Sequence, residues 1–216
     1  MSKLNVIDRR FFLRCVSSTA LTLPLIGLGV VELSCASATS GTALTNSDKI
    51  AVPGSWRTTI SSDKEPGEPL IVSGTIYAPD GRTPMEGINL YVYQTDATGV
   101  YSTRTGEDQR GTRLNGAMRS NGEGKYEFRT VKPGSYPGSS NPAHIHAYVS
   151  GPGYPEYWID EYHFDDDRFI NDEEKRKAAE KGSFSPILKL TRGSDGILRG
   201  LRDIKLERCS RNCTGR

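Results

Sequence analysis

The chain has 216 residues, 28 of them basic and 26 acidic, so its formal net charge is only +2. Four of those bases and two of those acids lie in the first 38 residues, which leaves 24 of each in the rest of the chain. Nucleic-acid-binding proteins normally carry a basic excess or stripe, so this balance excludes a general polyanion-binding surface and predicts no nucleic-acid partner.

The N-terminus has the pattern of an export signal. Residues 8–14 read Asp-Arg-Arg-Phe-Phe-Leu-Arg, an apolar run follows over residues 16–31, and residues 36–38 (Ala-Ser-Ala) offer a small-residue cleavage site. The paired arginines indicate the twin-arginine route. We therefore expect a cleavable signal over residues 1–38 and a periplasmic or extracellular protein without stable membrane association. A retained anchor helix and lipidation at Cys35 are the alternatives.

Residues 39–68 are rich in small, polar and charged side chains and show no sustained hydrophobic periodicity. They predict an irregular N-terminal arm. From residue 69 the pattern changes to short β-rich runs, and we assign residues 69–216 to one folded domain. The roughly 178 residues left after the signal are enough for such a domain and its hydrophobic core.

Short segments of alternating or β-branched residues, separated by Gly, Pro and Asn turns, fill most of this domain. Residues 172–181 change from acidic to basic and predict a single helix ended by Gly182. The pattern is typical of an all-β, single-domain β-sandwich with short helical excursions, rather than of a parallel sheet. The predicted strands cover residues 70–77, 88–95, 125–131, 144–149, 187–190 and 198–206.

His144 and His146 stand two residues apart in one of these predicted strands. Side chains at that spacing point to the same face, roughly 7 Å apart, so both imidazoles can reach one metal ion. Many such pairs are simply solvated on surface strands. The chain has only three histidines, and this pair follows the turn Asn141-Pro142-Ala143. These details favour a metal site without naming the metal.

Two tyrosines fall in predicted loops at strand ends. Tyr101 follows a turn that contains Gly99, and Tyr136 stands between Gly134 and Pro137. Loops on a β scaffold often carry functional side chains. Tyrosines in such places also commonly cap the core with the hydroxyl outward, so each tyrosine alone leaves both interpretations open.

Taken in order, three motifs resemble the intradiol ring-cleavage dioxygenases, the family of protocatechuate 3,4-dioxygenase and catechol 1,2-dioxygenase. They are Gly-x-Tyr at residues 99–101, Pro-Gly-x-Tyr-Pro at residues 133–137 and Pro-Ala-His-x-His at residues 142–146. The resemblance runs from about residue 69 to residue 167. It implies a non-haem Fe(III) dioxygenase that inserts both atoms of O2 into a catechol-type ring, with intradiol cleavage to a cis,cis-muconate-type product.

The resemblance also implies a ligand set for ferric iron: phenolates from Tyr101 and Tyr136, and imidazoles from His144 and His146. It gives Tyr101 a catalytic role as well, as the tyrosinate that the catechol displaces. A free phenol has a pKa near ~10, so ionising two of them at neutral pH requires a strong Lewis acid such as ferric iron. A ferrous oxygenase would instead show two histidines and one carboxylate.

Two further candidate catalytic residues depart from the family pattern. Asn141 stands where the family usually has an arginine that stabilises negative charge on the ring. Loss of one positioned donor can cost ~10²–10³ in rate. Either another basic residue substitutes, with Arg119 and Arg129 as the nearby candidates, or the substrate differs, or activity is low. Glu161 stands where relatives carry a glutamine that faces the substrate, and a carboxylate there disfavours acidic substrates unless it is protonated or paired.

Other residues carry weaker signals. The pattern makes His163 a partly buried strand residue, with a substrate contact as the alternative, and the acidic run at residues 165–167 a solvated turn. Cys209 and Cys213 predict a disulfide in an oxidising compartment rather than a metal site.

A second function stays open, because Asn141 replaces the expected arginine. This is a non-catalytic exported β-sandwich module that binds an aromatic or carbohydrate ligand. The extended arm and exposed sandwich edges also make a homodimer plausible.

Overall fold

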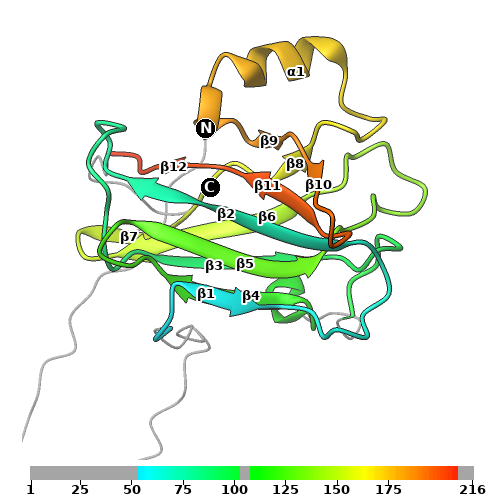
Figure 1. Ribbon diagram of the computed structural model, residues 1–216, viewed down its shortest axis with the longest axis horizontal. Helices are drawn as coiled ribbons and strands as arrows, with labels where there is room; N and C mark the ends of the chain where they lie inside the picture. Colours follow the sequence, from blue (N-terminus) through cyan, green and yellow to red (C-terminus); the bar gives the residue numbers. More distant parts are fainter. Residues whose placement is uncertain (1–52, 103–107, 209–216) are drawn as a thin grey trace, which may run out of the picture. The chain divides into compact units, whose positions relative to one another are not determined.

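The computed structural model describes residues 53–102 and 108–208. Most of its strands belong to two sheets that face each other (Figure 1). The larger sheet has the order β1-β5-β2-β11-β10, with β12 also paired to β2, and the smaller has the order β4-β3-β6-β7. A separate pair, β8 and β9, lies outside both. The described residues contain a single α-helix, so the predicted all-β class is confirmed.

The elements have the following bounds. The larger sheet consists of β1 (Arg57–Thr59), β2 (Pro69–Tyr77), β5 (Lys125–Val131), β10 (Thr191–Arg192), β11 (Leu198–Leu201) and β12 (Ile204–Lys205). The smaller sheet consists of β3 (Asn89–Gln94), β4 (Asn115–Arg119), β6 (Ile145–Gly151) and β7 (Tyr154–Trp158). The remaining elements are β8 (His163–Phe164), β9 (Ile187–Leu188), α1 (Asp172–Ala179) and the short 3-10 helices η1 (Gln109–Gly111) and η2 (Gly182–Phe184).

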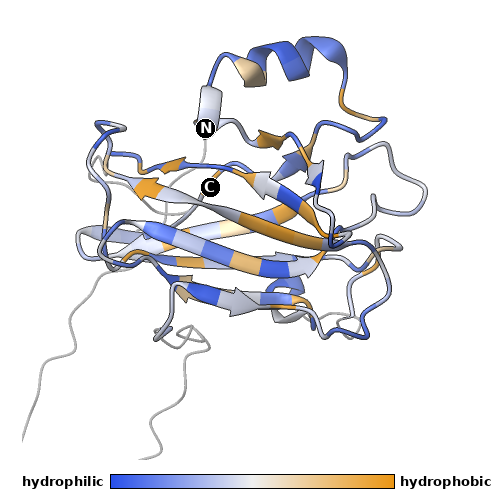
Figure 2. Cartoon of the chain, viewed as in Figure 1, coloured by the Kyte–Doolittle hydropathy of each residue, from blue (hydrophilic) through white to orange (hydrophobic). Residues whose placement is uncertain are grey.

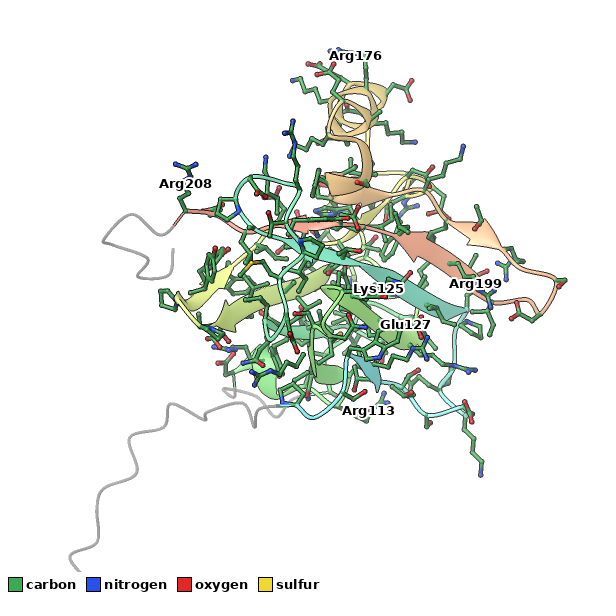
Figure 3. The ribbon with its side chains drawn as sticks, turned by 60° about the vertical axis from the view of Figure 1, so that its left-hand side comes forward. Arg113, Lys125, Glu127, Arg176, Arg199 and Arg208 are labelled. Carbon is green, nitrogen blue, oxygen red and sulfur yellow. The ribbon has the colours of Figure 1, made fainter. Side chains whose placement is uncertain are left out.

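The hydrophobic core lies between the two sheets because each strand buries alternate residues. Side chains of β2 and β5, such as Val72 and Phe128, are fully buried and belong to the same apolar cluster as Leu90 of β3 and Ile145 of β6. The inward positions are mostly hydrophobic. Figure 2 shows the apolar run near the start of β2. Most charged residues lie outside, with the buried Arg202 as an exception. Arg199 on β11, for example, projects away from the strands in Figure 3.

The structure differs from the sequence prediction in several strands, and β4, β7 and β10 were not predicted at all. Arg57–Thr59, expected in an irregular arm, pairs in parallel with β5 as β1, so the arm prediction is wrong for these residues. The predicted strand 198–206 is interrupted at Arg202. Its two parts are β11 and β12, and each pairs in parallel with β2. The predicted strand 187–190 keeps only Ile187–Leu188, which pairs with β8.

The predicted helix exists as α1, a largely hydrophilic helix beside β9 (Figures 1 and 2). Its N-cap is Asn171, whose side chain accepts a hydrogen bond from the backbone of Glu174 while Glu174 bonds back to the Asn171 backbone. Such a reciprocal capping box stabilises the first helical turn. Within residues 53–102 and 108–208, no helix is long and apolar enough to cross a membrane. The predicted signal and the pair Cys209 and Cys213 lie outside the described residues.

Candidate metal centre

Four side-chain atoms converge at the start of β6. The hydroxyl oxygens of Tyr101 and Tyr136 lie 2.9 Å apart, and the Tyr136 hydroxyl lies 3.0 Å from His144 Nε2 and 3.4 Å from His146 Nε2. The two Nε2 atoms are 3.2 Å apart. Ligand atoms bound to one ion at about 2.0–2.2 Å lie roughly 3 Å from each other, so the spacing fits a single metal ion. The structure therefore brings together all four residues of the predicted ligand set.

This cluster lies on the outer face of the smaller sheet. Ile145 and Ala147 of β6 point into the core, so the intervening His146 points outward. Tyr93 is its register partner on β3, and their rings stack with centroids 4.6 Å apart. Trp158 of β7 packs edge-on against the same imidazole at 5.4 Å. The outer face thus gives the candidate site an aromatic wall.

A short backbone pairing fixes both histidines. Ile145 and Tyr162 exchange two backbone hydrogen bonds of 3.0 and 2.9 Å as an isolated antiparallel bridge. In such a pairing the residues that flank the bridge lie side by side, which sets His146 next to Glu161 and His144 next to His163. His163 is a half-buried residue of β8, as the sequence predicted. Its ring centroid lies 5.9 Å from that of His144.

The outer ring nitrogens of the two histidines have acceptors of their own. His144 Nδ1 lies 2.7 Å from the Pro142 carbonyl oxygen, and His146 Nδ1 lies 2.8 Å from Glu161 Oε1. The second contact has the length but not the alignment of a hydrogen bond, so it acts mainly as an electrostatic contact. A proton held on Nδ1 leaves Nε2 with a lone pair, and this tautomer suits a metal ligand.

Glu161 therefore contacts His146 at Nδ1, the ring nitrogen that does not face the tyrosine hydroxyls. A carboxylate oxygen of Glu161 and one ring nitrogen each of His144 and His146 lie within 4.8 Å of one another. This grouping resembles a ferrous site made of two histidines and one carboxylate. The carboxylate, however, approaches the Nδ1 side of His146, whereas the tyrosine hydroxyls lie on the Nε2 side. Contact with His146 lowers the pKa of the Glu161 carboxyl although burial opposes it, so the group is anionic.

Burial raises the pKa of both the Tyr101 and the Tyr136 phenol, and the nearby Glu161 charge raises each further. Without a cation, both hydroxyls are therefore neutral at physiological pH. Converting them into phenolates in this place needs a cation of high charge. The donor set of two hard oxygens and two imidazole nitrogens fits ferric iron.

The two tyrosines come from loops that are hydrogen-bonded to each other. The Gly134 backbone N–H donates to the Asp96 carbonyl at 2.9 Å, and the Thr95 hydroxyl donates to the Gly134 carbonyl at 3.0 Å. Gly99 has φ of +83°, and a Cβ built there would lie 1.9 Å from the Ser135 carbonyl oxygen. Gly99 thus permits a close approach of the two backbones, which sets Tyr101 against Tyr136.

We expect Gly99→Ala to weaken metal binding about 10–100-fold, because the two loops must move apart to admit the methyl group. Gly138→Ala is the matched control. Gly138 also has a positive φ, of +73°, but a Cβ there meets nothing within 4 Å, so this variant carries the backbone strain alone. A metal titration of both variants makes the comparison. Equal affinities would show that the backbone contact does not set the site.

The remaining predicted residues lie elsewhere. Asn141 is exposed, and its one hydrogen bond in the described part of the chain runs from its backbone N–H to Ser139 Oγ. Arg129 belongs to the other sheet and pairs with Asp63 at 3.6 Å. Arg119 lies opposite Asn89, at the end of β3 away from Tyr93. Neither arginine lies at the cluster, so the expectation that one of them replaces the missing arginine is wrong.

Sequence reasoning did not assign site roles to the aromatic residues beside the cluster. Arg110 of η1 lies 4.0 Å from the Tyr148 ring centroid and pairs with Glu156 at 2.9 Å. Tyr148 in turn packs on Trp158 at 3.9 Å. The only sequence signal for this surface is the outward position of these residues in β6 and β7. Their meeting depends on which strands become neighbours.

Fold and site together define a β-sandwich protein with a candidate mononuclear metal centre made of two phenols and two imidazoles. The family model described as Dioxygenase matches residues 50–191, about two thirds of the chain. The chain belongs to the intradiol ring-cleavage dioxygenase family.

Two curated relatives illustrate the sequence similarity. Catechol 1,2-dioxygenase 1 of Acinetobacter lwoffii is 33% identical over 109 residues, which cover 42% of this chain and 34% of that protein. The protocatechuate 3,4-dioxygenase beta chain of Burkholderia cepacia is 28% identical over 115 residues, 48% of each chain. The chain thus spans about a third to a half of the length of these relatives.

Two solved structures cover more of the chain. One is the dioxygenase domain of a dioxygenase carbohydrate-binding protein fusion from Streptomyces sp. SirexAA-E, with 25% identity and a TM-score of 0.54 over 71% of this chain and 88% of that one. The other is an intradiol ring-cleavage dioxygenase from Tetranychus urticae, with 22% identity and a TM-score of 0.54 over 73% and 89%. The second comparison speaks for the fold alone.

Proposed function

We propose that this chain is a non-haem Fe(III) dioxygenase that opens a catechol-type ring between its two hydroxylated carbons, inserts both atoms of O2 and forms a cis,cis-muconate-type product. The observation that carries the proposal is the convergence of four ligand atoms. The Tyr136 hydroxyl lies 2.9–3.4 Å from the Tyr101 hydroxyl and from both imidazole Nε2 atoms, which are 3.2 Å apart. Family membership supports the same reaction.

Tyr101, Tyr136, His144 and His146 would hold the iron. When bound, ferric iron would orient the two catechol oxygens and activate the ring towards dioxygen. The protein holds the two imidazoles with Nε2 towards the ion, through the Pro142 carbonyl and the Glu161 carboxylate.

Tyr101 is the ligand best suited to leave when substrate binds. In the described part of the chain its hydroxyl contacts only that of Tyr136, whereas the Tyr136 hydroxyl contacts Tyr101 and both histidines. Departure of Tyr101 therefore disturbs the other three least. Burial raises the pKa of the Tyr101 phenol, so this residue would favour its protonated form once it left the metal, and a catechol hydroxyl would supply the proton.

The test is oxygen consumption by the iron-loaded protein with a panel of catechols, together with ultraviolet spectra of the products. We expect stoichiometric oxygen uptake and a muconate-type spectrum, and visible colour from phenolate-to-iron charge transfer. A folded protein that stays colourless and iron-free when iron is ample contradicts the proposal. Full iron occupancy without oxygen uptake on any catechol would instead support a non-catalytic binding module, a function compatible with the exposed Asn141.

The charge of Glu161 suggests which catechols are favoured. Its side chain is 35% exposed beside the cluster, so a carboxylated ring would bring a second negative charge close to it. At an effective dielectric constant near 20–40, two like charges roughly 7 Å apart repel by about 1–2 kcal/mol. We propose that uncharged catechols are preferred over 3,4-dihydroxybenzoate.

Glu161→Gln is expected to raise the ratio of kcat/KM for 3,4-dihydroxybenzoate to that for catechol about tenfold, because the repulsion disappears. A ratio is measured because the variant also weakens the support of His146, which affects both substrates. Glu156→Gln is the control, since Glu156 is another carboxylate on the same outer face but is paired with Arg110. An unchanged ratio in Glu161→Gln contradicts the preference.

A further inference from the structure

Asp167 lies outside the four-atom cluster but is hydrogen-bonded to two of the segments that build it. Its Oδ2 accepts a hydrogen bond of 2.8 Å from the Ala143 backbone N–H and one of 3.3 Å from the Ser135 hydroxyl. Ala143 directly precedes His144, and Ser135 directly precedes Tyr136. One carboxylate oxygen therefore connects the residue before His144 to the residue before Tyr136.

The carboxylate is itself held in a firm turn. Asp167 Oδ1 accepts a hydrogen bond of 2.8 Å from the Phe169 backbone N–H. The Asp167 backbone N–H donates to the Phe164 carbonyl at 3.1 Å, and its carbonyl accepts from Ile170 at 3.2 Å. Phe164 and Ile170 are buried in turn. The position of Oδ2 is thus fixed by packed apolar side chains.

Its neighbours in the acidic run behave differently. The Asp166 carboxylate pairs with Lys132 Nζ at 2.6 Å and is 54% exposed. Asp165 contributes a backbone N–H to the Leu188 carbonyl. Asp166 thus also contacts the loop before Tyr136, but at Lys132, four residues away. In the described part of the chain, Asp167 alone among the three bonds to the residues that directly precede Tyr136 and His144. The expectation that the whole run is a solvated turn is wrong for Asp167.

We propose that Asp167 is a positioning residue that holds the Tyr136 hydroxyl and His144 Nε2 at their 3.0 Å spacing before any ion binds. Hydrogen bonds to an ionised acceptor are about twice as strong as neutral ones, so the shared carboxylate resists separation of the two segments. Removing it leaves the Ala143 N–H without its acceptor and frees both segments to move apart. The role in iron binding rests on the proposed function, whereas the role in the metal-free protein does not.

The first measurement uses metal-free full-length protein. Amide hydrogen exchange at Ala143 is followed by NMR in the wild type, Asp167→Ala and Asp166→Ala. We expect exchange at Ala143 to become at least about tenfold faster in Asp167→Ala, because its amide loses its acceptor, and to stay unchanged in Asp166→Ala. Asp167→Asn keeps an acceptor oxygen and should lie between the two.

The second measurement is the iron affinity of the same variants, by competition with a chelator of known affinity. Loss of an outer partner of a metal site typically costs about 10–100-fold in affinity, and we expect a loss of this size in Asp167→Ala, a smaller loss in Asp167→Asn and none in Asp166→Ala. Thermal unfolding of the metal-free variants separates positioning from stability. A lower midpoint with unchanged iron affinity means a merely structural residue and overturns the inference.

The outcomes also separate this inference from the proposed function. If Asp167→Ala matches Asp166→Ala in exchange and in iron affinity, the positioning role is wrong while the dioxygenase proposal stands. If the wild type binds no iron but exchange at Ala143 responds to Asp167→Ala, the dioxygenase proposal fails and the positioning of the two segments stands. Should Asp167→Ala not fold, Asp167→Asn and Ser135→Ala, which removes only the 3.3 Å bond, carry the same comparison.

Discussion

Tyr136→Phe is expected to abolish tight iron binding and, with it, ring cleavage. The Tyr136 hydroxyl is the hub of the cluster, at 2.9 Å from Tyr101 and at 3.0 and 3.4 Å from the two imidazoles. Its removal deletes a central ligand atom, so the loss in affinity should exceed the ~10–100-fold that loss of an outer partner costs. Where iron is forced in by excess, visible absorption per iron should fall by roughly half, because one of two phenolates remains.

Tyr91→Phe is the matched control for that experiment. Tyr91 is also a half-buried tyrosine of the smaller sheet, but its hydroxyl donates to the Arg110 carbonyl instead of joining the cluster. The control should keep its iron and its colour, with a stability loss of about 1 kcal/mol for one hydrogen bond. If Tyr136→Phe keeps wild-type iron content and colour, the ligand assignment is wrong.

Removing iron from the wild-type protein should lower its thermal midpoint by about 10 °C. A ligand present at about a thousand times its dissociation constant stabilises the folded state by ~4 kcal/mol, and each kcal/mol shifts the midpoint of a domain of this size by roughly 2–4 °C. Differential scanning calorimetry of the metal-free and reloaded protein measures the shift. Colour should disappear with the metal, because the visible absorption is a charge transfer from phenolate to iron.

His146→Ala provides the control for iron removal, since a protein that lacks one of the four ligands should show little further shift when iron is withdrawn. The comparison isolates stabilisation by the site from any effect of the chelator on the rest of the fold. A wild-type midpoint that does not depend on iron would contradict a metal centre in this position.

The sequence predicted the elements whose signals are local. Strands β2 and β5 have nearly the predicted bounds, because apolar alternation and flanking turns mark them directly. The two imidazoles share a face because side chains two apart in a strand must do so. The gathering of both tyrosines with the histidines was implied only by the resemblance, since three separate loops have to fold together to achieve it.

Contacts set by strand register could not be predicted in this way. The bridge between Ile145 and Tyr162 places the Glu161 carboxylate beside His146 Nδ1, a contact that no local pattern around either residue indicates. Asp167 was expected in a solvated turn because its two neighbours carry the same side chain, and nothing local distinguishes it from them. A run of identical residues shows that the segment is acidic. The role of each carboxylate depends on the direction in which the turn points its side chain.

The position of the cluster on the outer face of β6 has a consequence for how this protein tolerates sequence change. Ile145 and Ala147 hold the sandwich together from one side of the strand, while His146 serves the site from the other. Point substitutions can therefore alter chemistry and folding separately. A one-residue insertion or deletion within β6 would exchange the two sides, turning the imidazole into the apolar core and the aliphatic residues towards the site. The length of this strand is therefore constrained more tightly than the identity of any one of its residues.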